Sequence, residues 1–161
     1  MHVTTMKRFF FYSLLLSLVA SIAAAQPTIF IVRHAEKADA TKDPDLSEAG
    51  RLRAEYLAKM LKDANITAIY ATEFKRTQQT AAPLAKALGL SVMTLPAGDD
   101  AVPKLRSTTG NSLVVGHGNT IPDLIKALGI SEQINIAEND YDNLFIVVLD
   151  EKPRLIRLHY R

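Results

Sequence analysis

The aliphatic run at 28–32 (TIFIV) constrains the fold more than any other stretch of the chain. An apolar run without polar interruption is typical of a β-strand that other elements cover on both faces. Two cationic side chains, Arg33 and His34, follow directly where this strand is expected to end. The pattern therefore predicts a buried strand that either ends in solvent or presents Arg33 and His34 to an anionic group.

Strand-like and helix-like segments alternate along the rest of the chain. Further strands are expected at 66–72, 91–95, the start of 111–120, 143–150 and 153–160, and the last two are close enough to form a hairpin. Amphipathic helices are expected at 46–64 and 73–90, with shorter ones within 96–110 and from 121 onward. This alternation predicts a three-layer α/β/α fold with a mostly parallel central sheet. Residues 26–161 are expected to form one such domain.

Residues near the predicted helix ends have the character of caps. Ser47 is placed to cap the helix at 46–64, and Thr72 to cap the helix at 73–90. Gly89 is placed to end the second of these helices.

Residues 1–25 differ in character from the remainder of the chain. A basic pair is followed by an apolar run at 9–23 and by small residues just before Gln26. This order predicts a secretory signal peptide that is cleaved after Ala25. An uncleaved membrane anchor is the alternative, although the run is shorter than the roughly 20 residues that a spanning helix needs. We therefore expect a periplasmic or secreted protein with no stable membrane anchor after cleavage.

The charge balance excludes some classes of function. The chain carries 19 Lys and Arg against 17 Asp and Glu, and cleavage after Ala25 would remove Lys7 and Arg8 and leave equal numbers. General nucleic-acid binding needs a clustered basic face, so no nucleic-acid partner is expected. The absence of cysteine excludes disulfides and thiolate chemistry. The four histidines lack the spacing of a metal site, so neither a metal nor another cofactor is expected.

Three strand ends bring basic side chains to one edge of the predicted sheet. Arg33 and His34 end the first strand, Arg76 lies in the first turn of the second long helix, and His117 follows another strand between two glycines. Ligands of open α/β sheets bind beyond the carboxyl ends of the strands. The fold is therefore expected to gather two arginines and two histidines at one place.

Phosphoryl transfer is the chemistry that uses such a set of side chains. Arginine presents a planar fork to two phosphate oxygens, and a helix N-terminus adds backbone donors. One neutral imidazole can act as a nucleophile while a second stabilises charge on the phosphoryl oxygens. Arg33, His34 and Arg76 could each be solvated, but the glycines around His117 favour close approach to a ligand. The ordered set therefore favours a phosphate site.

On these residues the chain resembles the histidine phosphatase superfamily, also called phosphoglycerate mutase-like. The sequence VRHAEK at 32–37 is similar to the family's RHG motif, with Ala35 in place of glycine. The stretch 69–90 resembles the segment around the family's second arginine, and LVVGHGNT at 113–120 resembles that around its second histidine. The helix that opens with LSEAG at 46–50 is similar to the family's first helix.

The resemblance implies a phosphoglycerate mutase-like fold and a role for each matching residue. His34 would be the nucleophile that takes the phosphoryl group, and Arg33, Arg76 and His117 would form the phosphate pocket. Asn119 would add an amide donor at the rim of that pocket.

A general acid is missing from the expected places, because Gly118 and Asn119 follow the second histidine. Glu36 is the tentative acid, with Asp99 and Asp100 as alternatives. Glu73 stands where the family often has aspartate, and its simplest role is to cap its helix.

The sequence thus predicts an exported, metal-independent phosphomonoesterase that works through a phosphohistidine at His34. Its substrate would be a phosphorylated small molecule, a glycolipid or a protein, and the sequence indicates no oligomeric state. One alternative is a catalytically inactive module that binds phosphate or another anion, since the acid is missing. A phosphomutase is the other alternative, which the short inserts disfavour.

Overall fold

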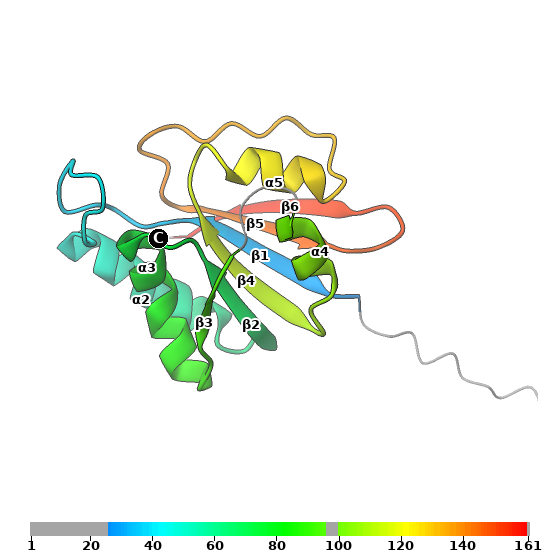
Figure 1. Ribbon diagram of the computed structural model, residues 1–161, viewed down its shortest axis with the longest axis horizontal. Helices are drawn as coiled ribbons and strands as arrows, with labels where there is room; N and C mark the ends of the chain where they lie inside the picture. The colour runs from blue at the N-terminus through cyan, green and yellow to red at the C-terminus, as the bar shows by residue number, and fades with distance from the viewer. Residues whose placement is uncertain (1–25, 96–99, 161) are drawn as a thin grey trace, which may run out of the picture.

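The computed structural model describes residues 26–95 and 100–160 (Figure 1). The predicted signal peptide at 1–25 lies outside these residues, as does Asp99. Within the two described ranges, no helix has both the length and the apolar character needed to cross a membrane.

A six-stranded sheet forms the centre of the molecule, with the strand order β3-β2-β4-β1-β5-β6. The strands are β1 (Thr28–Arg33), β2 (Ile66–Ala71), β3 (Val92–Thr94), β4 (Asn111–Gly116), β5 (Asn143–Val148) and β6 (Arg154–His159). The pairs β1–β4, β4–β2 and β2–β3 are parallel, whereas β5 is antiparallel to β1 and forms a hairpin with β6. The predicted mostly parallel sheet and its terminal hairpin are confirmed.

Helices cover both faces of the sheet, which confirms the three-layer α/β/α arrangement. The helices α2 (Glu48–Leu61) and α3 (Lys75–Leu88) pack side by side on one face, and α4 (Ala101–Arg106) and α5 (Ile121–Ala127) lie on the other (Figure 1). A hydrophobic core lies on each face of the sheet, and the strand β1 contributes side chains to both. Ile31 packs towards α5, whereas Val32 packs towards α2 and α3. This double burial explains why the run at 28–32 contains no polar residue.

The helix caps agree with the sequence in two cases and differ in one. Ser47 is the N-cap of α2, where its hydroxyl accepts a hydrogen bond from the Gly50 N–H, and Gly89 ends α3 with a φ of 67°. The prediction that Thr72 caps α3 is wrong, because the N-cap is Phe74. A carboxylate from a distant loop, that of Asp43, accepts the Lys75 N–H at 2.9 Å instead.

The strand register places the carboxyl ends of the central strands at one edge. Arg33 pairs with Gly116 across β1 and β4, and Ala71 pairs with Val115 across β2 and β4. The segments that leave β1, β2 and β4 therefore begin within one small region of the molecule.

Candidate active site

The ends of β1, β2 and β4 border a cavity of about 570 Å³, here called the phosphate cavity. The five residues predicted to bind or react with a phosphate all line it: Arg33, His34, Arg76, His117 and Asn119. The rings of His34 and His117 are 5.4 Å apart between centroids and meet edge to face. The fold thus brings together residues separated by more than 80 positions in the chain, and their catalytic roles stay predictions.

The His34 side chain is held in one orientation and one tautomer. Its Nδ1 lies 2.8 Å from the Ala35 carbonyl oxygen. A carbonyl oxygen can only accept a hydrogen bond, so Nδ1 carries the proton and Nε2 keeps its lone pair. Burial lowers the pKa of His34 to about 4, and the positive charges of Arg33 and Arg76 act in the same direction. The imidazole is therefore neutral at physiological pH and able to act as a nucleophile.

Arg33 is anchored by a segment that follows α5. Its Nη1 donates to the carbonyl oxygens of Ala137 at 2.8 Å and Glu138 at 2.6 Å, and its guanidinium lies 4.6 Å from the centroid of the Tyr141 ring. The Nε atom is buried and has no hydrogen-bond partner among the described residues. A buried guanidinium group with an unpaired donor favours binding of an anionic oxygen.

Arg76 reaches the same cavity from the first turn of α3. Its guanidinium lies 4.3 Å from the centroid of the Phe74 ring, and its Nη1 donates to the Lys42 carbonyl at 3.2 Å. The Oδ1 atom of Asp43 lies 4.0 Å from the same Nη1, which is the upper limit for an ion pair. As with Arg33, the buried Nε has no partner within the described ranges. Two arginines therefore line the cavity, and the buried Nε of each has no partner among the described residues.

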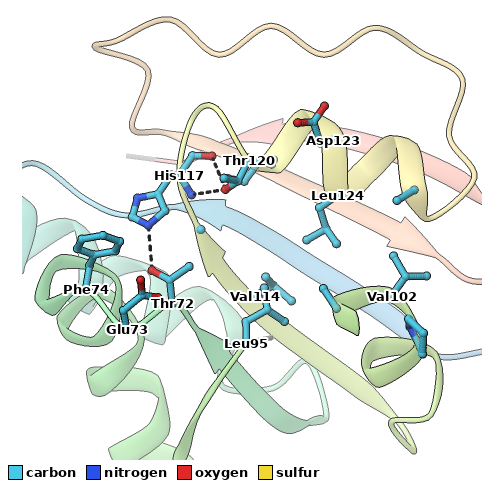
Figure 2. A pocket seen from close by; sticks show the side chains of 15 residues that line it. Thr72, Glu73, Phe74, Leu95, Val102, Val114, His117, Thr120, Asp123 and Leu124 are labelled. Atoms are coloured by element: carbon cyan, nitrogen blue, oxygen red, sulfur yellow. Dashed lines mark hydrogen bonds between the residues drawn. The ribbon is translucent and has the colours of Figure 1, made fainter. Parts of the chain in front are cut away.

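A chain of hydrogen bonds orients His117. The Nη2 of Arg76 donates to its Nδ1 at 3.5 Å, which makes Nε2–H the donor to the Thr72 hydroxyl at 2.9 Å (Figure 2). Thr72 in turn lies 2.9 Å from the hydroxyl of Thr77. Burial, reinforced by the charge of Arg76, lowers the pKa of His117 to about 4, whereas the charge of Glu73 opposes this shift. His117 is thus neutral and positioned before any ligand binds.

The predicted acid role of Glu36 does not agree with the structure. Its carboxylate accepts hydrogen bonds from Nε and Nη2 of Arg53, the shorter at 2.7 Å, and Glu36 is not among the described residues that line the phosphate cavity. Burial alone would raise the pKa of Glu36, but Arg53 outweighs it and holds this pKa below its usual value. Because Glu36 is paired with Arg53 and does not line the cavity, it is a structural partner of Arg53 instead.

The other candidate carboxylates occupy different positions. Asp100 is the exposed N-cap residue of α4 and is not among the described residues that line the phosphate cavity. Asp99 lies outside the described residues. Glu73 lines a second cavity that also contains His117 and Thr72 (Figure 2). Glu138 lines the phosphate cavity itself, with its backbone carbonyl bound to Arg33. Among the described residues, Glu73 and Glu138 are therefore acidic residues that border the predicted site.

Several contributors to the site were not predicted from the sequence. Tyr141 and the carbonyls of Ala137 and Glu138, which hold Arg33, come from a segment without a recognisable motif. Thr80 accepts the Ala35 N–H at 3.0 Å and donates to the Arg76 carbonyl at 2.7 Å. The sequence did contain a signal for Thr80, because it lies in the stretch 69–90 that resembles the segment around the second arginine of the histidine phosphatase superfamily.

The arrangement is suited to a phosphoryl group. Two guanidinium groups can balance a dianion, and a neutral imidazole with a free lone pair lines the same cavity. Among the described residues, no group of three or more His, Cys, Asp and Glu side chains is placed to hold a metal ion.

The chain is similar to known proteins both in sequence and in structure. The family model of the histidine phosphatase superfamily (branch 1) matches residues 29–100. Phosphoserine phosphatase 1 of Hydrogenobacter thermophilus is 38% identical over a match that covers 40% of this chain and 34% of that protein. The match thus spans about a third of the length of this curated relative.

Solved structures extend the likeness to most of the chain. The protein histidine phosphatase SixA, solved with tungstate, superposes with a TM-score of 0.67 at 22% identity, covering 82% of this chain and 96% of that one. A phosphoglycerate mutase from Plasmodium falciparum superposes with a TM-score of 0.54 at 20% identity, covering 84% and 91%. At these identities the structures show a shared fold, and the fold includes both phosphatases and mutases.

Proposed function

Because the chain belongs to the histidine phosphatase superfamily, we propose that it is a phosphomonoesterase that forms a phosphohistidine on His34. One observation carries the proposal: the neutral His34 imidazole is fixed by the Ala35 carbonyl in a cavity that Arg33 and Arg76 also line. The phosphatases among the relatives, which include phosphoserine phosphatase 1, support this class of reaction.

In the first step, a phosphate monoester dianion binds between the guanidinium groups of Arg33 and Arg76. The Nε2 lone pair of His34 attacks phosphorus, an N–P bond forms and the P–O bond to the leaving group breaks. The Ala35 carbonyl accepts the Nδ1–H and so stabilises the positive charge that develops on the ring. His117, held by Thr72 and Arg76, lines the same cavity.

The leaving-group oxygen needs a proton unless it departs as a stable anion. We assign this proton to the carboxyl group of Glu73, which lines the second cavity together with His117. In the second step, water gives a proton to the Glu73 carboxylate and attacks phosphorus, and the N–P bond breaks. Phosphate leaves, and neutral His34 is regenerated. The cycle balances without a metal ion, so we propose metal-independent catalysis.

The phosphoenzyme is the observable that tests this proposal. Protein mixed with a ³²P-labelled monoester and quenched in base should carry one labelled phosphoryl group, stable in base and lost in mild acid, as expected for phosphohistidine. His34→Asn should abolish both labelling and turnover. His159→Asn is the matched control, because His159 lies on β6 with its side chain 57% exposed. Phosphate binding without labelling or turnover would overturn the proposal in favour of an anion-binding module.

The role of Glu73 has its own test. Glu73→Gln should slow hydrolysis of phenyl phosphate by about 10²-fold, yet barely affect p-nitrophenyl phosphate, whose leaving group needs no proton. Glu55→Gln, an exposed glutamate on α2, should change neither rate. Equal slowing of both substrates by Glu73→Gln would show that Glu73 acts on phosphate binding rather than on the leaving group.

We also propose that the protein acts outside the cytoplasm, on the basis of the basic, apolar and small residues in 1–25. Fractionation of the producing cells and N-terminal sequencing of the purified protein test this. A mature N-terminus at Gln26 in an extracytoplasmic fraction is expected, whereas an intact Met1 in the cytoplasm would refute export.

A further inference from the structure

A second cavity of about 650 Å³ adjoins the phosphate cavity, and most of its lining is apolar. We call it the leaving-group cavity; Figure 2 shows side chains from β4, α4, α5 and the chain before α4 around it. Its apolar walls include Leu95, Val102, Val114, Ile121, Leu124 and Ala127. A volume of this size matches the range in which small organic molecules are bound.

The two cavities share part of their walls. His117, Phe74 and Thr120 line both of them. The His117 ring lies 5.4 Å from that of His34 on one side and 5.2 Å from that of Phe74 on the other, measured between centroids. A substrate whose phosphorus lies beside His34 and His117 can therefore extend its remaining atoms past His117 into the leaving-group cavity.

The charges of the two cavities are opposite in kind. Arg33 and Arg76 line the phosphate cavity together with one acidic residue, Glu138, whereas the described residues around the leaving-group cavity include no lysine or arginine. Its charged side chains are those of Glu73 and Asp123. A carboxylate or a second phosphate placed there would lose water without gaining a cationic partner and would lie near the carboxylate of Glu73.

We infer that the leaving-group cavity selects monophosphates whose leaving group is apolar and carries no second negative charge, such as aryl and branched alkyl phosphates. This inference rests on the proposed phosphatase function and names the substrate class of the same site. Phosphoglycerates and bisphosphates fall outside the class, because their second anionic group would have to enter this cavity. The cavity therefore favours a phosphatase over a phosphoglycerate mutase.

A pair of substrates of the same shape tests the inference directly. The substituents of 4-isopropylphenyl phosphate and 4-carboxyphenyl phosphate are nearly equal in size, and only the second bears an extra negative charge. We expect kcat/KM to be higher for the isopropyl ester by about tenfold or more, although the carboxyphenol is the better leaving group. A ratio of one or less, with turnover still dependent on His34, would overturn the inference and leave the phosphatase proposal intact. Absence of turnover and of phosphoenzyme with every ester would instead refute both.

Two variants of α5 locate the effect in the cavity. Ala127→Phe places a large side chain at an exposed position on its wall and should lower, by about tenfold, the ratio of kcat/KM for 4-isopropylphenyl phosphate to that for acetyl phosphate. Leu124→Lys adds a cation and should shift preference towards the 4-carboxyphenyl ester. Lys126→Phe is the control, because Lys126 is exposed and is not among the described residues lining either cavity. Unchanged ratios in both α5 variants would place the leaving group elsewhere.

Discussion

The helices on the two faces of the sheet differ in length and in which parts of the candidate site they position. On one face, α2 and α3 have 14 residues each and pack against one another. On the other, α4 has 6 residues and α5 has 7, and the leaving-group cavity lies between them and β4. The long helices carry Arg76 and contact the segment after His34, whereas the short helices leave space for the rest of a substrate. Selectivity for the leaving group is thereby assigned to the α4/α5 face, while Arg76 and the position of His34 depend on the α2/α3 face.

The α2/α3 face holds the segment after β1 at several points. The Gly50 Cα lies so close to this segment that an added Cβ would be 2.3 Å from the Glu36 carbonyl oxygen. Thr80 accepts the Ala35 N–H, and the Gln79 side chain accepts the Leu46 N–H. The backbone that follows His34 is therefore held by Gly50, Thr80 and Gln79, and this leaves His34 little freedom to move.

The largest effect that this comparison predicts concerns Arg76. Arg76→Lys should lower kcat/KM by about 10²-fold, because lysine keeps the charge but loses the planar fork that matches two phosphate oxygens. The loss should be the same for 4-isopropylphenyl and 4-carboxyphenyl phosphate, since Arg76 contacts the group they share. Arg154→Lys, an exposed position on β6, serves as the control. A loss confined to one ester would break the division between the two faces.

Gly50→Ala should disturb the α2/α3 face as a whole. The new methyl group meets backbone atoms of Glu36, which no side-chain rotation can relieve. We expect a loss of about 3 kcal/mol in the free energy of unfolding, measured in urea, together with slower turnover of every ester. Gly89→Ala is the matched control: its φ of 67° strains alanine, but a Cβ there has open space. It should cost about 1 kcal/mol without loss of activity; full activity in Gly50→Ala would contradict the tight positioning of His34.

These contacts also mark the limit of what the sequence could predict. Apolar periodicity and the order of motifs sufficed for the layers, the hairpin and the meeting of Arg33, His34, Arg76 and His117, because each depends on local pattern and strand polarity. The partner of Glu36 did not follow, since Arg53 lies 17 positions away on a helix whose rotation the pattern leaves open. Tyr141 carries no motif and reaches Arg33 only through the path of the chain between α5 and β5.

The free energy of unfolding should depend on pH because burial lowers the pKa of His34. Its folded pKa of about 4 lies below the 6.5 of the unfolded chain, so protons bind to the unfolded state first as the pH falls. Stability is complete above about pH 6.5 and declines until the pH reaches the folded value. The free energy of unfolding should fall by about 2 kcal/mol between pH 7.5 and 5 on account of His34. His34→Gln should reduce this loss, whereas His159→Gln should not; equal slopes in all three proteins would refute the assignment.

The smallest effect expected on the α2/α3 face is that of Thr80, which positions the segment after His34 without lining the phosphate cavity. Thr80→Val keeps the shape of the side chain but leaves the buried Ala35 N–H without an acceptor, at a cost of about 1 kcal/mol in unfolding free energy. Because the Ala35 carbonyl orients the His34 ring, kcat should fall while KM stays nearly constant. Thr80→Ser, which retains the hydroxyl, should restore kcat even if its lost methyl group lowers stability. Equal kcat values in the two variants would mean that Thr80 contributes packing alone. On the α2/α3 face, Gly50 and Gln79 would then be the residues that position His34.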